Sequence, residues 1–326
     1  MTLNERIEAL IEWGRDLSLP IEIIELAYQK NNWFTPENQS EALCAIKNDY
    51  LKKERLYKWI SSYDIKNHVT PKTIAIVAAG NLPLVSIHDL ISVFISGSIS
   101  MIKLSEKDSI LIPYVLDRLF KLDSRTSKYF LTVPKLSGFD AVIATGSDNS
   151  ARYFEYYFGK YPHIIRKNRN GIAILNGKET KEELRLLGKD IFSFFGLGCR
   201  NISKLYVPKN YDFTPLLEVL FDFKEIMNHN KYKNNFDYNY AILLLGKEKF
   251  LSNGCIILKE ETKISSPIGV VYYEYYETIS EIEIDPQKTQ CIVSKKDLPF
   301  GQAQHPNLWD YADGIDTVQF ILNLYQ

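Results

Sequence analysis

The amino-acid sequence predicts an α/β fold built from two lobes. Short apolar runs alternate with helical segments from Thr73 to Phe158, as they do in a doubly wound parallel sheet. A second alternation follows over residues 172–207, after the basic turn 166–170. The chain has 326 residues, and because a domain takes about 100–200 residues, two lobes are the natural expectation for this length.

We place the boundary between the lobes in that basic turn. Residues 1–168 then comprise N-terminal helices and the first lobe, and residues 169–302 form the second lobe. Residues 303–326 are expected to pack back on the first lobe. This division leaves each lobe with its own alternation of strands and helices, which is what an independent core requires.

The first 70 residues are predicted to be helical. Glu5–Leu17 carries apolar residues at helical spacing. A second helix should begin at Thr35-Pro36-Glu37, because Thr35 can cap it, Pro36 suits the first turn and Glu37 favours the positive end of the helix dipole. The sequence therefore predicts a helical segment in front of the first strand.

Short apolar runs rich in β-branched residues are typical of buried parallel strands. In the first lobe the predicted strands are Thr73–Ala79, Ser100–Leu104 and Ala141–Ala144, and the predicted helices are Ile87–Ile95, Ile110–Leu122 and Ser150–Phe158. After residue 170 the predicted strands are Ile172–Leu175, Lys204–Val207, Tyr240–Leu245, Cys255–Leu258, Val270–Tyr273 and Cys291–Val293, and the predicted helices are Lys181–Phe195 and Asp316–Tyr325.

Composition narrows the range of partners and locations. Lys and Arg number 39 and Asp and Glu number 40, so the formal net charge is −1 and the whole chain has no attraction for nucleic acid. The N-terminus is charged and lacks the apolar core of a secretory signal. No apolar stretch approaches the roughly 20 residues that span a bilayer. We expect a cytoplasmic protein with no nucleic-acid partner and no membrane span.

The cysteines and histidines show no metal-binding pattern. None of the four cysteines forms a CxxC pair or a Cys/His cluster with zinc-ligand spacing, so we expect no metal and no disulfide framework. Cys44, Cys255 and Cys291 are interpreted as packing residues. The histidines are scattered and interpreted as structural, with His305 the best candidate to lie near a site; the five are His68, His88, His163, His229 and His305.

Cys199 stands in the segment that is most informative about chemistry. A predicted helix runs into the glycines of Gly196-Leu197-Gly198, then Cys199, then a predicted strand. This is not a dinucleotide fingerprint, because it follows a helix and Asn201 fills the place of the third glycine. Glycines let a planar substrate approach the sulfur closely. A thiol presented in this way suits nucleophilic attack on a carbonyl carbon.

Six short segments, in the correct order, resemble motifs of the aldehyde dehydrogenase superfamily. They are residues 80–84, 101–106, 144–147, 173–178, 196–207 around Cys199, and 299–301. The resemblance implies a Rossmann-like cofactor lobe and a catalytic lobe with a cleft between them. It makes Cys199 the nucleophile and Asn81 the oxyanion donor, and it implies cofactor-binding roles for Lys103, Ser105, Glu106, Thr145, Gly146 and Ser147.

A closer resemblance is to the acyl-CoA reductase family, which includes the fatty-acid reductase of bacterial bioluminescence. It rests on residues 32–38, 166–170, 195–201 and 311–314. This resemblance favours NADPH, whereas the carboxylate of Glu106 near an adenosine ribose would repel a 2′-phosphate and favour NADH. We expect NADPH and leave NADH open. The basic turn 166–169 could neutralise cofactor or CoA phosphates, or could simply be solvated.

One departure from the superfamily pattern bears on the reaction. Hydrolytic members carry a Glu that activates water where this chain has Ile174. An acyl group on Cys199 should therefore resist hydrolysis and be reduced instead. We expect NAD(P)H-dependent reduction of an acyl-CoA, with a fatty acyl chain favoured, to aldehyde and free CoA. The alternatives are an aldehyde or semialdehyde dehydrogenase and a catalytically silent acyl- or cofactor-binding partner. A homodimer and an acyl-donor protein both stay open.

Overall fold

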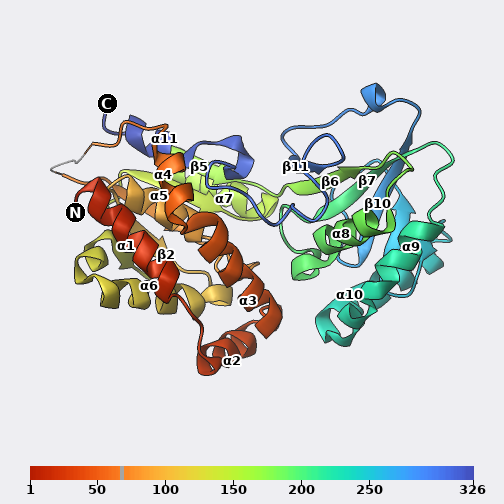
Figure 1. Ribbon diagram of the computed structural model, residues 1–326, viewed down its shortest axis with the longest axis horizontal. Helices are drawn as coiled ribbons and strands as arrows, with labels where there is room; N and C mark the ends of the chain where they lie inside the picture. Colours follow the sequence, from red (N-terminus) through yellow and green to blue (C-terminus); the bar gives the residue numbers. More distant parts are fainter. Residues whose placement is uncertain (67–69) are drawn as a thin grey trace. The chain divides into compact units, whose positions relative to one another are not determined.

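The computed structural model describes residues 1–66 and 70–326, and these divide into two compact units. Unit 1 comprises Met1–Asn168 together with Pro306–Gln326, and unit 2 comprises Arg169–His305. Each unit has one β-sheet with helices packed against it (Figure 1). The α/β class predicted from the sequence is confirmed.

The N-terminal segment is helical, as predicted. Its helices are α1 (Leu3–Asp16), α2 (Ile21–Lys30), α3 (Pro36–Ala45) and α4 (Lys53–Ile60), with a π-helical turn over Ile46–Tyr50. α3 begins where the sequence indicated, because the Thr35 hydroxyl accepts a hydrogen bond from the backbone N–H of Asn38 at 3.3 Å.

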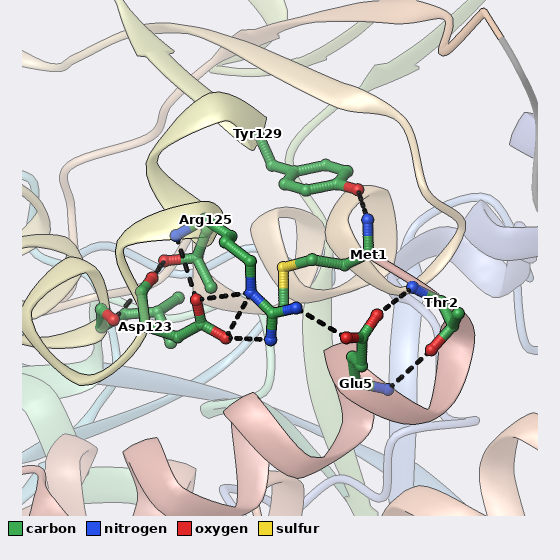
Figure 2. A network of polar contacts seen from close by, with 8 residues as sticks. Met1, Thr2, Glu5, Asp123, Arg125 and Tyr129 are labelled. Carbon is green, nitrogen blue, oxygen red and sulfur yellow. Dashed lines mark hydrogen bonds and ion pairs between the residues drawn. The ribbon is translucent and has the colours of Figure 1, made fainter.

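Polar contacts anchor the start of α1 to a distant segment of unit 1 (Figure 2). Thr2 and Glu5 form a capping box, in which each side chain accepts from the other's backbone N–H. Arg125 donates to Glu5 at 2.6 Å and to Asp123 at 2.8 Å. The backbone N–H of Thr2 and the guanidinium of Arg125 lower the pKa of Glu5 to about 2. The carboxylate thus joins α1 to the turn that follows α6 (Leu111–Leu122).

Unit 1 contains a five-stranded parallel sheet in the order β3-β2-β1-β4-β5. Its strands are β1 (Thr73–Val77), β2 (Ile99–Lys103), β3 (Phe130–Thr132), β4 (Ala141–Thr145) and β5 (His163–Arg166). The sequence predicted β1, β2 and β4 but not the two edge strands. β3 has three residues, two of them exposed, and β5 begins with an exposed histidine, so neither shows a buried apolar run.

Helices cover both faces of this sheet, because successive strand residues point to opposite sides. Ile74 and Ile76 belong to a core that includes α1, α5 (Ile87–Ile95), α6 and α11 (Thr317–Asn323). Ala75 belongs to a second core, into which α7 (Asp148–Phe158) places Phe154 and Phe158. The strand order reverses between β1 and β4, and in open α/β sheets ligands bind at the carboxyl ends of strands beside such a switch point.

Unit 2 contains a six-stranded sheet in the order β11-β6-β7-β10-β9-β8, parallel except where β8 meets β9. Its strands are β6 (Asn170–Ile174), β7 (Ile202–Pro208), β8 (Leu251–Ser252), β9 (Ile257–Glu260), β10 (Val270–Tyr276) and β11 (Thr289–Val293). Its helices are α8 (Lys181–Phe192), α9 (Thr214–Leu220) and α10 (Asn230–Leu245).

The strand predicted over Tyr240–Leu245 is wrong, because these residues form the last turns of α10. A short apolar run does not distinguish a strand from a helix, and the helix starts ten residues earlier, where the His229 side chain accepts from the backbone N–H of Tyr232. α10 is 16 residues long. Within residues 1–66 and 70–326, every helix is too short or too polar to cross a membrane.

Candidate active site

Cys199 lies exposed on a turn of unusual backbone geometry between α8 and β7. Phe194 (φ 51°, ψ 31°) and Phe195 (φ 58°, ψ 23°) are left-handed, and Gly196 follows with φ 76°. This region costs a non-glycine residue roughly 1–2 kcal/mol. Two such residues in succession need support from the surrounding structure. The turn is therefore a strained element that presents the thiol to solvent.

The side chain of Asn201 supplies that support. It is 2% exposed, and its Oδ1 accepts from the backbone N–H of Gly198 at 2.8 Å. Its Nδ2 donates to the carbonyls of Ser193 at 2.5 Å and Asp190 at 3.3 Å. From the sequence, Asn201 was noted as the residue in place of a third glycine and as part of the resembling segment 195–201, and no supporting role was predicted for it. The available signal was a polar residue directly in front of a buried strand.

Asp190 connects the same helix end to a second turn. Its carboxylate accepts from the backbone N–H groups of Gly301 at 2.6 Å and Ala303 at 3.0 Å. The side chain is buried, and burial raises its pKa to about 6, while the two backbone hydrogen bonds oppose that rise. The turn over residues 299–303, which includes the segment 299–301 singled out in the sequence, is thus tied to the helix end that holds Asn201.

The other three cysteines differ in their surroundings. Cys291 on β11 is half-buried, its Sγ lies 3.6 Å from the carbonyl oxygen of Arg200, and burial raises its pKa to about 12. Cys255 is buried, and its pKa is raised to about 11 for the same reason. Cys44 is exposed, so its interpretation as a packing residue is wrong. Among the described residues Cys199 is the exposed thiol on a glycine-rich turn.

Ile174 is the last residue of β6, at the position where the sequence resemblance would place a water-activating Glu. It is half-buried and packs in an apolar cluster with Ile172, Tyr206 and Tyr276. The matched Lys204 is also structural, because its buried Nζ donates to Glu274 at 2.8 Å. The side chain at position 174 therefore offers no proton acceptor.

In unit 1 the predicted cofactor residues follow three neighbouring strands. Ser105 and Glu106 follow β2, Thr145 ends β4 and Gly146 and Ser147 follow it. Asn81, the predicted oxyanion donor, is exposed in the loop after β1. β1 pairs with both β2 and β4, in parallel. Carboxyl ends of parallel strands meet at one edge of a sheet, so the fold brings these segments together at the switch point.

Two of these loops are in direct contact. A Cβ on Gly80 would lie 2.3 Å from Ser105 Oγ and 2.7 Å from Ser105 Cβ, so a side chain at position 80 would separate them. The backbone N–H of Leu84 donates to Asp108 Oδ2 at 2.9 Å, which holds the loop after β1 against the turn after β2. The segment with Asn81 and the segment with Glu106 therefore form one surface.

The third loop ends at the N-terminus of α7. The Ser147 hydroxyl caps this 11-residue helix by accepting from the backbone N–H of Ser150 at 3.3 Å. Gly146 packs closely on the helix, because a Cβ there would lie 2.9 Å from the Phe154 ring. A helix N-terminus favours phosphate. With Lys103 exposed at the end of β2, the donor set of this edge suits a dinucleotide.

Arg166 does not contribute to this edge as a phosphate ligand. Its guanidinium is buried and donates to both carboxylate oxygens of Asp89, at 2.7 and 2.8 Å, and to the Thr317 hydroxyl at 3.1 Å. Arg169 donates to the carbonyl of Pro286 at 2.8 Å. The structure contradicts the phosphate interpretation of the basic turn for Arg166, which joins β5 to α5 and α11 instead.

Two histidines, His88 and His229, have the structural roles that the sequence indicated. The His88 ring lies 2.9 Å from the carbonyl oxygen of Leu308, and His229 caps α10. His305 is exposed directly after the turn at 299–303. His68 lies outside the described residues.

Asp108 makes stability depend on pH. It is 3% exposed, and burial raises its pKa from an ordinary 3.8 to about 6, while backbone N–H groups of Leu84, Leu111 and Ile112 oppose the rise. Because the folded value lies above the unfolded one, ionisation penalises the folded state. The penalty is absent below about pH 4 and complete above about pH 6.

Replacing Asp108 with Asn removes this penalty. The unfolding free energy of the variant, relative to wild type, should rise by about 2–3 kcal/mol between pH 4 and pH 8, since the pKa is raised to about 6. Urea unfolding at a series of pH values measures the difference. A difference that stays constant or falls with pH contradicts the assignment.

Comparisons with known proteins identify the fold. No protein-family model and no curated protein sequence matches the chain. Aldehyde dehydrogenase 21 from Physcomitrella patens is similar in structure, with 14% identity and a TM-score of 0.62 over 86% of this chain and 70% of that one. A putative aldehyde dehydrogenase from Burkholderia cenocepacia is 12% identical, with a TM-score of 0.63 over 86% and 71%. An NADP-dependent enzyme from E. coli gives 13% and 0.60 over 90% and 72%. The chain therefore has the aldehyde dehydrogenase-like α/β fold.

Proposed function

We propose that the protein is an NAD(P)H-dependent reductase that accepts an acyl group from a CoA thioester on Cys199 and releases it as an aldehyde. The observation that carries the proposal is the exposed thiol on a strained, glycine-rich turn, combined with Ile174 in an apolar cluster. The first feature suits acyl capture, and the second disfavours loss of the acyl group to water. The aldehyde dehydrogenase-like fold supports oxidoreductase chemistry at the carbonyl carbon of the acyl group.

In the proposed reaction Cys199 Sγ attacks the thioester carbonyl, and the bond from that carbon to the CoA sulfur breaks. The Asn81 amide and the Cys199 backbone N–H are assigned, by resemblance, to the oxyanion. One donor of this kind is worth about 3 kcal/mol in related sites. Once the acyl carbon has accepted a hydride, its oxyanion re-forms the carbonyl, the carbon–sulfur bond to Cys199 breaks, and the aldehyde leaves while the electron pair stays on Cys199 as the free thiolate. A fatty acyl chain is the substrate that the resemblance favours.

The edge of the unit 1 sheet would hold the cofactor. Lys103, Ser105 and Glu106 are assigned to the adenosine ribose, and Thr145, Gly146 and Ser147 to the pyrophosphate at the start of α7. The reduced nicotinamide supplies a hydride when bound. We propose NADPH as the preferred form, because the family resemblance favours it. The exposed carboxylate of Glu106 argues for NADH instead.

A second candidate is an NAD(P)-dependent dehydrogenase that oxidises a free aldehyde. It is favoured by the structural neighbours, since aldehyde dehydrogenase 21 from Physcomitrella patens was solved with its reaction product succinate. It requires water to attack the acyl group on Cys199. The apolar surroundings of Ile174 leave that position without a group to activate water, so we rank this candidate second.

A panel of acyl thioesters separates the two functions. Acyl-CoAs of increasing chain length, and the same acyl groups on a carrier protein, are incubated with NADPH or NADH. The proposal expects one aldehyde and one free thiol for each reduced cofactor consumed. In a separate incubation with free aldehyde, NAD(P)⁺ and no CoA, steady acid formation with one NAD(P)⁺ reduced for each acid formed would establish the second candidate. A wild-type protein with neither activity and no acyl adduct on Cys199 would rule out both.

A further inference from the structure

We infer that Asn201 is a positioning residue that sets the reactivity of Cys199 through the backbone around it. The inference rests on the proposed function, in which Cys199 is the nucleophile. Asn201 touches no group assigned to substrate, since its hydrogen bonds all go to backbone atoms of unit 2. Its effect on chemistry must therefore pass through the turn that it holds.

Asn201 binds the C-terminal end of α8. The last carbonyls of a helix have no partner within it and carry the negative end of the helix dipole. The carbonyls of Asp190 and Ser193 lie at this end, and both accept from Asn201 Nδ2. The Asn201 amide thus donates to two carbonyls at the negative end of α8, next to the turn that carries Cys199.

Asn201 also holds Gly198, the residue in front of the cysteine. Asn201 Oδ1 accepts from the Gly198 N–H at 2.8 Å, and the Gly198 carbonyl accepts from the Asn201 N–H at 3.2 Å. This pair closes the turn around Cys199. Asparagine offers both donors and an acceptor, whereas aspartate of nearly the same shape offers acceptors only. The three side-chain contacts therefore specify this residue type.

Asp190 links this turn to the turn over residues 299–303. The backbone carbonyl of Asp190 accepts a hydrogen bond from the Asn201 amide. Its carboxylate accepts from the backbone N–H groups of Gly301 and Ala303. The two turns are therefore fixed to the same residue of α8. A loss of Asn201 frees one of them without touching the other.

The experiment measures the rate at which iodoacetamide alkylates Cys199 between pH 6 and pH 9, by mass spectrometry, in wild type, Asn201→Asp and Asn201→Ser. Asn201→Asp keeps the acceptor for the Gly198 N–H, but it removes the donor to the carbonyls of Asp190 and Ser193 and adds a carboxylate. The pH at half-maximal rate should rise by about one unit, because negative charge disfavours the thiolate. Asn201→Ser, the milder change, should shift it in the same direction by less.

Asn253→Ala is the matched control. In the turn between β8 and β9, Asn253 Nδ2 donates to the carbonyl of Leu217 at 2.9 Å, and its Oδ1 accepts from Cys255 and Ile256. It makes the same kinds of contact at another place in unit 2, so its loss should lower the melting temperature without moving the alkylation profile. Slow alkylation of the buried Cys255 in the other variants reports that they are folded.

A wild-type profile in both folded Asn201 variants, with stability reduced as in Asn253→Ala, overturns the inference. The readout does not depend on substrate. If the profile shifts as expected but no acyl thioester is reduced, the positioning role stands and the proposed function fails. If reduction proceeds, kcat in Asn201→Asp should fall at least about tenfold, the size of a one-unit shift in reactivity, while KM changes little.

Discussion

Replacing Cys199 with alanine should lower aldehyde formation from acyl-CoA by at least about 1,000-fold, since removal of a covalent nucleophile leaves only binding and oxyanion contributions. The acyl adduct should disappear at the same time. Rapid-quench mass spectrometry with one equivalent of acyl-CoA and no reduced cofactor measures it directly. In wild type the adduct should build up within the first turnover, because Ile174 leaves water without an activating group.

Cys44→Ser is the control for this experiment. Cys44 is also exposed, but it lies on α3 in unit 1, in none of the segments assigned to the site. The variant should keep wild-type aldehyde formation and the adduct on Cys199. Aldehyde production by Cys199→Ala, or an adduct that moves to Cys44, would remove Cys199 from its role.

The fold was predictable where a strand is buried on both faces. Ile74, Ala75 and Ile76 in β1 are fully buried, so their apolar run appears directly in the sequence. β3 and β5 were not predicted, because these edge strands contain exposed or charged residues among their buried ones. The Tyr240–Leu245 run misled for the opposite reason: an apolar run can continue a helix whose start lies well upstream.

The candidate nucleophile could be proposed from the sequence, but the residues that hold its turn in place could not. The glycines around Cys199 stand next to it in the sequence, so the thiol could be identified from local pattern. Asp190 and Asn201 act through hydrogen bonds to backbone atoms, and every residue offers the same backbone groups. No local pattern marks such a contact. Only the tertiary structure shows which carbonyls an asparagine reaches.

Arg166 illustrates the same limit for charge. It stands beside two other basic residues, a pattern typical of a solvated turn or a phosphate site. Its partner Asp89 lies 77 residues earlier, and both side chains are less than a tenth exposed. Charged residues are rarely buried unless paired. Nothing in the sequence around either residue indicates that the fold brings Asp89 of α5 and Arg166 of β5 together.

Replacing Asp89 with alanine should destabilise unit 1 by about 3–5 kcal/mol, because it leaves the Arg166 guanidinium buried without its carboxylate. A domain is stable by only about 5–15 kcal/mol, so the variant should be near its unfolding midpoint in mild denaturant. All four tryptophans, Trp13, Trp33, Trp59 and Trp309, belong to unit 1. Their fluorescence during urea unfolding therefore reports on this unit selectively.

The double variant Asp89→Leu with Arg166→Met tests the physical reason. It removes both charges, so it should be more stable than either single variant, since apolar pairs often replace buried ion pairs without loss. Arg118→Met is the surface control: Arg118 and Asp16 are 33% and 28% exposed, and losing that pair should cost no more than about 1 kcal/mol. If the losses of unfolding free energy in the two single variants add up to the loss in the double variant, the two charges do not stabilise each other in the folded state. The stability of unit 1 would then depend on how the two side chains pack, and Arg166 would matter for its stem rather than its charge.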